Sequence, residues 1–370
     1  MMPVLAAHDR QRSDWQHDLR EHYRRFMSDR AALDSGLLNR LQYLNTFAVF
    51  LSLSTGTNSD NEIRDQVEYL TAEWHRAWFL PAWQWGRTPF PGGMPERIAW
   101  KLTTPNPSLT YYRAIIDEEE FGLAIASSLI VARRKLGMAD DPDMIAALAW
   151  AGTIYRDEMV AHPDGGIIFQ PGVYRDHRDY QYAGHQVLAP SLPPSPVDGI
   201  GPDTSHSHRT LVFLRQHTMA AQLLGQDATV FIRTARGFAQ RFRCLLNERT
   251  LNGRRFWSTV NYTSGHDGLY RYRYVTTSES GYGPGELSGT MTLGWWGGNA
   301  DGGLADFYGD MLTTFPLSEA AIRLYVGPNT TRVRHPMMTW PTFFNNGFAE
   351  LLVRLASGQR AGRRLVSTNG

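Results

Sequence analysis

The stretch DEEEFGLAIASSLIVARRK, residues 117–135, decides the predicted fold. It begins with four acidic residues and ends with Arg133, Arg134 and Lys135. Acidic side chains stabilise the N-terminus of an α-helix and basic side chains its C-terminus, because each opposes the partial charge of the helix dipole at that end. The sequence therefore predicts one long helix over this stretch.

Helical periodicity continues on both sides of residues 117–135. Six more segments are predicted as helices, either because apolar side chains recur at helical spacing or because helix-start and helix-stop residues frame the segment. They are 14–27, 37–53, 61–79, 142–160, 209–224 and 227–247. Gly225 separates the last two segments, as a C-cap glycine does. These segments predict a mainly α protein.

Two long segments lack any period. One follows Leu80 and is interrupted by many prolines and glycines, while carrying Trp83 and Trp85. The other runs from His162 to Thr204 and is rich in Gly, Pro, Tyr and His. Loops of this length inside a folded chain are usually functional.

The segment 256–296 has a β-like pattern. Tyr270, Tyr272 and Tyr274 alternate with arginines, and 287–296 is predicted as a partner strand. Short helices are expected near Ala305 and over 344–355, followed by a polar tail.

The predicted fold class is mainly α, either an incomplete (α/α) toroid or an irregular helical bundle. Long loops and a small antiparallel β ribbon near 256–296 complete it. We expect a helical domain over 1–250 that carries the His- and Tyr-rich loops. The β ribbon and the short C-terminal helices, 251–370, are expected to pack on the same core.

The composition excludes several classes of protein. The formal net charge is +1, which argues against a general nucleic-acid binder, and we expect no sequence-specific nucleic acid as partner. Cys244 is the only cysteine, so no disulfide can form within the chain. Of the 37 basic residues only Lys101 and Lys135 are lysines. This bias fits either a GC-rich genome or the binding of carboxylates by arginine forks.

The sequence contains no apolar run of about 18 residues, so we predict no membrane span. The first residues lack the apolar core of a secretion signal. A cytoplasmic or virion location is therefore expected, unless a signal is missing from the sequence.

Six of the twelve histidines lie between His162 and His217. They are His162, His177, His185, His206, His208 and His217. His, Tyr and Arg side chains act near neutral pH as base, acid and anion clamp. His and Tyr also anchor loops through their amphipathic rings, and the sequence leaves both interpretations open.

Metal binding receives little support from the sequence. His206 and His208 have the spacing of a metal pair that Asp203 or His185 would complete, but no second metal-like spacing accompanies them. The acidic run 140–143 is better explained as a helix N-terminus. We predict no metal and no cofactor.

Short blocks in the middle of the chain resemble the helical-toroid polysaccharide lyases of the hyaluronate and chondroitin lyase group. In chain order the blocks are Trp83-Gln84-Trp85-Gly86 with Pro89, Asp164-Gly165-Gly166, Tyr174, Tyr182-Ala183-Gly184-His185, and Asp203-Thr204-Ser205-His206-Ser207-His208-Arg209. The resemblance covers roughly residues 83–209. It departs from the family at Gly166, which replaces a serine, and at Gln170, which stands where a catalytic histidine is expected.

The resemblance implies β-elimination next to a uronic acid in an acidic polysaccharide or oligosaccharide. The enzyme must neutralise the carboxylate, remove the proton α to it and protonate the leaving oxygen. The implied catalytic residues are Tyr182 as base and acid, His185 or His177 as its partner, and Arg209 as carboxylate clamp. The implied substrate-binding residues are Trp83, Trp85, Tyr174, His206 and His208.

A non-enzymatic class competes with this interpretation. Near-neutral charge, the absence of a visible signal and long loops rich in aromatic residues and proline also suit a protein that contacts copies of itself. A viral capsid or another closed shell is the corresponding hypothesis. The tryptophans and histidines would then serve packing and assembly.

Overall fold

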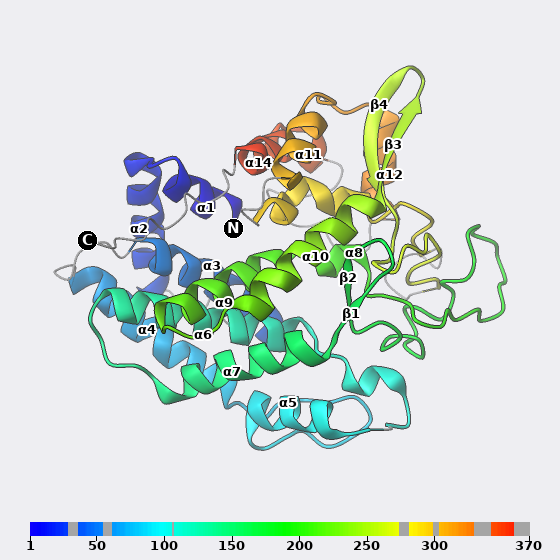
Figure 1. Ribbon diagram of the computed structural model, residues 1–370. Helices are drawn as coiled ribbons and strands as arrows, with labels where there is room; N and C mark the ends of the chain where they lie inside the picture. Colours follow the sequence, from blue (N-terminus) through cyan, green and yellow to red (C-terminus); the bar gives the residue numbers. More distant parts are fainter. Residues whose placement is uncertain are drawn as a thin grey trace.

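Helix α6 (Asp117–Lys135) lies at the centre of the fold and has the predicted bounds. Every residue from Glu118 to Ala132 is buried. The helices α3, α4, α7 and α9 pack directly against it, and Figure 1 shows them gathered around it. A central helix enclosed by others is an irregular helical bundle, which is the second of the two predicted architectures.

The computed structural model describes residues 1–28, 36–54, 61–105, 107–273, 281–298, 303–328 and 342–358. Its first half contains α1 (Met2–Asp9), α2 (Ser13–Ser28), α3 (Leu37–Ser54), α4 (Asn61–Trp78), α5 (Gly93–Thr103), the 3-10 helix η2 (Thr110–Arg113), α6, α7 (Pro142–Asp157), β1 (Met159–Ala161) and β2 (Ile167–Phe169). Its second half contains α8 (Thr204–Ser207), α9 (Thr210–Leu223), α10 (Thr229–Leu245), β3 (Leu246–Leu251), β4 (Arg254–Thr259), η3 (Ser288–Leu293), η4 (Trp295–Gly298), α11 (Gly303–Leu312), α12 (Glu319–Val326), α13 (Thr342–Asn345) and α14 (Phe348–Ser357). The mainly α prediction is confirmed.

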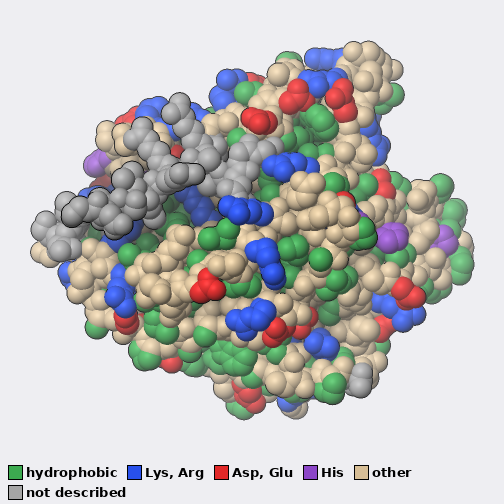
Figure 2. Space-filling model, in the orientation of Figure 1, with side chains coloured by type: hydrophobic (Ala, Val, Ile, Leu, Met, Phe, Trp, Pro, Cys, Tyr) green, Lys and Arg blue, Asp and Glu red, His purple; other side chains and the backbone are tan. Residues whose placement is uncertain are grey.

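The surface carries charges of both signs. On the face shown in Figure 2, Lys and Arg side chains are interspersed with Asp and Glu side chains. Among the described helices, none combines the length and the apolar character that crossing a membrane requires.

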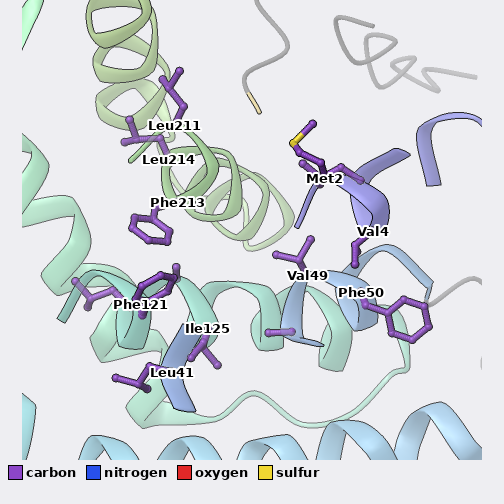
Figure 3. Close-up of a cluster of buried hydrophobic side chains, with 14 of the residues drawn as sticks. Met2, Val4, Leu41, Val49, Phe50, Phe121, Ile125, Leu211, Phe213 and Leu214 are labelled. Atoms are coloured by element: carbon purple, nitrogen blue, oxygen red, sulfur yellow. The ribbon is translucent and has the colours of Figure 1, made fainter. Parts of the chain in front are cut away.

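One large hydrophobic core joins the N-terminal helix α1 to α14, the last described helix. Figure 3 shows Met2 and Val4 of α1 near Val49 and Phe50 of α3, with side chains of α6 and α9 beside them. Helix α14 packs against α1 and α11, so residues beyond 250 contribute to the same core. Removing apolar surface from water is the main force that holds these helices together.

The β ribbon exists, but it begins earlier than predicted and shares only residues 256–259 with the predicted segment 256–296. Strands β3 and β4 pair antiparallel, with Leu246 opposite Thr259. Asn252 and Gly253 connect them with positive φ values of 53° and 74°, and this turn matches the twist of a β-hairpin. The ribbon therefore spans 246–259.

The predicted strands at 270–274 and 287–296 are wrong for the described residues. Residues 287–296 form most of η3 and η4, and the glycines in this segment suit tight turns. Arg271 and Arg273 have φ values of 54° and 53°, which an extended strand does not allow. A single bridge joins Tyr270 to Tyr282, and Tyr274 lies outside the described residues.

The proline-rich segment after Leu80 contains a helix that the sequence did not predict. Helix α5 begins at Gly93 and carries Pro95 in its first turn, where the missing N–H of proline costs no hydrogen bond. The histidine-rich segment is irregular, as predicted, apart from the β1–β2 hairpin at its start and the short helix α8 at its end.

Candidate active site

The acidic N-terminus of α6 is fixed to α5 by buried ion pairs. The Arg97 Nη1 atom lies 3.1 Å from Glu118 Oε2, and Lys101 Nζ lies 2.5 Å from Glu119 Oε1. Burial lowers the pKa of Lys101 to about 8 although Glu119 opposes the shift. Breaking such a pair leaves an uncompensated buried charge, so these contacts hold the site rigidly in place.

Aromatic rings extend from this acidic end toward the surface. Trp83 donates a 2.9 Å hydrogen bond from Nε1 to Glu118 Oε2. Its ring meets Trp85 edge-on at 5.0 Å, Trp85 meets Tyr111 at 5.1 Å, and Tyr111 meets His177 at 4.9 Å. We call Trp83, Trp85, Tyr111 and His177 the aromatic shelf. Trp83 is 38% exposed and the other three are half-buried, so the shelf is open to solvent.

Two tyrosines connect the shelf to a buried carboxylate. Tyr174 lies 6.0 Å from His177, ring to ring, and stacks on Tyr180 at 4.9 Å. The Tyr180 hydroxyl then donates a 2.8 Å hydrogen bond to Asp203 Oδ2. Burial, followed by the Asp117 and Glu120 carboxylates, holds the pKa of Tyr174 well above its ordinary value. Tyr174 therefore stays a neutral phenol.

Asp203 and His206 form an imidazole–carboxylate pair. Asp203 begins the short helix α8 and accepts hydrogen bonds from the backbone N–H groups of Ser205 and His206. The His206 Nδ1 atom lies 2.9 Å from both carboxylate oxygens. Burial lowers the pKa of His206, but the charge and the hydrogen bond of Asp203 together raise it above its ordinary value. The His206 side chain keeps 38% of its surface exposed.

Arg209 and Glu120 complete the surroundings of Tyr174. Arg209 forms an ion pair with Asp117 at the first turn of α6. Burial, followed by the Asp117 charge, raises the pKa of Glu120 to about 8. Glu120 is therefore largely protonated at neutral pH, and the Tyr155 hydroxyl lies 3.3 Å from it.

The tautomer of His177 follows from its backbone contact. The Asp179 N–H donates to His177 Nδ1 at 3.2 Å, so neutral His177 carries its proton on Nε2. Burial lowers the pKa of His177 despite the nearby Asp179 charge. His177 is thus a neutral hydrogen-bond donor at the inner end of the shelf.

Six of the nine predicted site residues gather around this end of α6. They are Trp83, Trp85, Tyr174, His177, His206 and Arg209. Tyr182 instead packs its ring on Tyr272, and the imidazole of His185 bonds to the carbonyl of Pro193. His208 is buried against Trp295. The side chains of Tyr182, His185 and His208 therefore do not join the other six predicted site residues.

The histidines of the middle segment do not converge on one place. His177 and His206 belong to the site, whereas His162 pairs with Asp164 on the β1–β2 hairpin. His217 is fully buried and shares a 2.8 Å hydrogen bond with Ser127. Burial lowers the pKa of His217 to about 3, so it is a neutral core residue.

Gln170 has a structural role in a sharp backbone turn. Its Oε1 accepts from the Ile115 N–H at 2.8 Å and its Nε2 donates to Glu158 Oε2 at 2.9 Å. Its φ is +39°, a conformation that non-glycine residues seldom adopt. Gln170 thereby ties the hairpin to the segment just before α6.

Sequence reasoning missed the acidic side of the site. Glu118, Glu119 and Glu120 were explained as helix-start residues, although all three are buried and partnered. Tyr111, which joins Trp85 to His177, was also missed. A signal existed: buried acidic residues in the first turn of a largely apolar helix require polar partners, and Arg97 and Lys101 supply cations for Glu118 and Glu119.

Among the described residues, one group has the geometry to hold a cation. His75 Nε2 lies 3.3 Å from Asp141 Oδ2 and 3.6 Å from Asp143 Oδ2. The group joins α4 to the first turn of α7, where Asp141 also caps the helix. It is separate from the shelf, and the chemistry below does not use it.

Comparisons with known proteins add no assignment. No protein-family model, no curated protein and no solved structure matches the chain.

Proposed function

We propose that this protein binds an acidic polysaccharide on the aromatic shelf and cleaves it by β-elimination next to a uronic acid. The observation that carries the proposal is the position of the Asp203–His206 pair beside Tyr174, at the inner end of the shelf. One oriented base, one neutral acid and a row of partly exposed aromatic rings are then available to a single sugar chain.

The shelf suits sugar rings. Trp83 and Trp85 stand nearly perpendicular, at 88°, so a pyranose can stack its apolar face on one of these indoles at a time. The indole N–H of Trp83 is already bonded to Glu118. Its ring orientation is therefore fixed before ligand arrives, which lowers the entropy cost of binding. The partial exposure of all four shelf rings leaves room for an extended chain.

His206 is the better base of the two site histidines. Asp203 is ionised, because the charge and hydrogen bonds of its partners hold its pKa far below the usual range despite burial. An ionised carboxylate only accepts, so His206 donates from Nδ1 and keeps its lone pair on Nε2. The same logic orients the histidine of an Asp–His dyad. His177 holds its proton on Nε2 and serves instead as a donor to the uronate carboxylate.

Tyr174 supplies the acid. In the elimination, His206 Nε2 takes the proton α to the carboxylate, and the electron pair of that C–H bond forms the new C=C bond. The bond from the β-carbon to the glycosidic oxygen breaks, and the Tyr174 hydroxyl protonates the leaving oxygen. Proton transfer from His206 through water restores Tyr174. Arg209, shared with Asp117, and the His177 N–H offset the carboxylate charge that grows during proton removal.

This assignment moves the base and acid roles from Tyr182 and His185 to His206 and Tyr174. Tyr182 and His185 contact Tyr272 and Pro193, so their surroundings give no reason to place them at the reacting bond.

The test is an absorbance assay. Hyaluronan, chondroitin and polygalacturonate are incubated with the protein, and ultraviolet absorbance from the C=C bond conjugated to the carboxylate is recorded. The proposal expects growth of this signal on at least one polymer, and its loss in His206→Gln. The shell hypothesis stays a prediction, and it expects no product with any polymer and a large particle on sedimentation. A soluble monomer without product on all three polymers contradicts both.

A further inference from the structure

A groove separate from the aromatic shelf lies between the β1–β2 hairpin and α10. Its volume is about 650 Å³. The hairpin contributes His162, Gly165 and Gly166, and the helix contributes a row of side chains that includes three arginines. The described residues therefore place a hollow of this size beside a basic helix face.

The lining of the groove contributes basic side chains and no acidic ones. Arg233, Arg236 and Arg243 line it, and no Asp or Glu does. The carboxylate of Asp164, within the same hairpin, already pairs with His162 and with the buried Arg241. Among described residues, neither Arg233 nor Arg243 forms an ion pair with a carboxylate. The groove therefore offers the guanidinium groups of Arg233 and Arg243 to a negatively charged ligand.

The helix period sets this row of arginines. Arg233, Arg236, Gln240 and Arg243 follow at steps of three, four and three, which places them on one face of α10. The opposite face is buried in the core through Phe231, Phe238 and Phe242. The helix cannot rotate without exposing these rings, so the row keeps facing the groove. From Arg233 to Arg243 the row is about 15 Å long. Figure 2 shows Lys and Arg side chains over the middle of the visible face, where Figure 1 places α9 and α10.

Glycines bring the two walls of the groove together. A Cβ atom on Gly237 would lie 2.5 Å from the Ile167 side chain, and one on Gly166 would lie 2.8 Å from Arg241 Cα. Gly165 adopts a φ of +81° and faces open space. The hairpin therefore sits close enough to α10 for backbone groups and arginines to face one ligand.

We infer that this groove binds the negative groups of an acidic glycan chain. Guanidinium forks match carboxylate and sulfate groups bidentately, which favours arginine over lysine for such a ligand. No Phe, Tyr or Trp lines the groove, so apart from the imidazole of His162 it lacks the stacking surface that single-stranded nucleic acid uses. The choice of a glycan rests on the proposed function, whereas the binding of anions rests on the groove alone.

The experiment is a calorimetric titration in the His206→Gln background, which prevents turnover of the probe and leaves the groove unchanged. The probe is a hexamer of galacturonic acid, at 50 and 200 mM NaCl. Cellohexaose is the neutral counterpart, and a six-nucleotide DNA is the nucleic-acid counterpart. The test variant is Arg233→Ala with Arg243→Ala. The matched control is Arg25→Ala with Arg156→Ala, which removes two exposed arginines from other helices.

We expect the test variant to bind the acidic hexamer about tenfold more weakly and with a smaller salt dependence, since two charge-assisted contacts are lost. The control variant and the cellohexaose affinity should not change. Unchanged affinity for the acidic hexamer in the test variant overturns the inference. Tighter binding of DNA than of the acidic hexamer overturns the choice of glycan. If the hexamer binds through the arginines while the wild-type protein yields no unsaturated product, the groove stands and the lyase proposal fails.

Discussion

The imidazole of His206 lies 2.9 Å from both carboxylate oxygens of Asp203, a residue that is only 2% exposed. Asp203 also accepts from the Tyr180 hydroxyl and from two backbone N–H groups. A buried carboxylate with this many donors stays ionised and holds the ring of His206 in one orientation. The proposed chemistry depends on this pair.

The first prediction concerns the pH profile of cleavage. A base must be unprotonated, so kcat/KM should rise with pH through the raised pKa of His206. Asp203→Asn removes the charge that raises this pKa, so the acidic limb should move to lower pH while the rate falls by about 10²-fold or more. Initial rates from pH 5 to pH 9 measure both effects. A limb that moves upward, or does not move, would exclude His206 as the base.

The second prediction compares two tyrosines of the same loop. Tyr174→Phe removes the proposed acid and should lower kcat by about 10²- to 10⁴-fold with little change in KM. Tyr182→Phe is the matched control, because its ring packs on Tyr272 outside the site. Cleavage rates of the two variants on the same polymer show which tyrosine is the acid. A large loss of kcat in Tyr182→Phe and a small one in Tyr174→Phe would assign the acid role to Tyr182 instead.

The third prediction concerns Glu120 and stability. The pKa of Glu120 is raised from 4.5 to about 8 in the folded protein. Between these values the folded state holds one proton more than the unfolded state, so the free energy of unfolding falls as pH rises, by up to about 1.4 kcal/mol per pH unit. Glu120→Gln should flatten this slope. Relative to the wild-type protein, the variant should therefore be more stable at pH 8 than it is at pH 5.

Urea denaturation at pH 5, 6.5 and 8 measures this slope. Glu319→Gln is the control, because the Glu319 side chain is 91% exposed. Parallel stability curves for the wild-type protein and Glu120→Gln would show that Glu120 is ionised in the folded protein.

The fourth prediction concerns the buried ion pairs beneath the shelf. Lys101→Met leaves Glu119 with Arg97 alone, and we expect a loss of about 3 kcal/mol in the free energy of unfolding. Adding Glu119→Gln should restore part of this loss, since the uncompensated charge is then gone. Lys135, the other lysine of the chain, is exposed, so Lys135→Met should cost far less. Equal losses for the two lysine variants would contradict the assigned role of Lys101.

The helical framework could be predicted because its signals are local. The acidic start and basic end of α6 follow from the helix dipole, and Gly225, with a φ of +68°, ends α9 as predicted. Helix α5 was missed because prolines usually break helices, whereas Pro95 occupies a first turn that tolerates it.

The site was predictable only in part, for a reason specific to loops. Trp83, Trp85 and His177 stood out by residue type alone, and they do lie together. Tyr180 and Tyr182 are two residues apart in a segment without a period, so no pattern shows which ring turns inward. The acidic residues of α6 satisfied a helix-start rule, and this explanation hid their buried partners.

The most direct test of the account is the mass of the fragment on the reducing-end side of the cut, which carries the new double bond at its non-reducing end. Limit digests of a uronate polymer by the wild-type protein and by His206→Gln are compared by mass spectrometry. The account predicts fragments one water lighter than the saturated oligosaccharides from the wild-type protein, and none from His206→Gln. Saturated fragments would mean hydrolysis, and equal yields from both proteins would remove His206 from the chemistry.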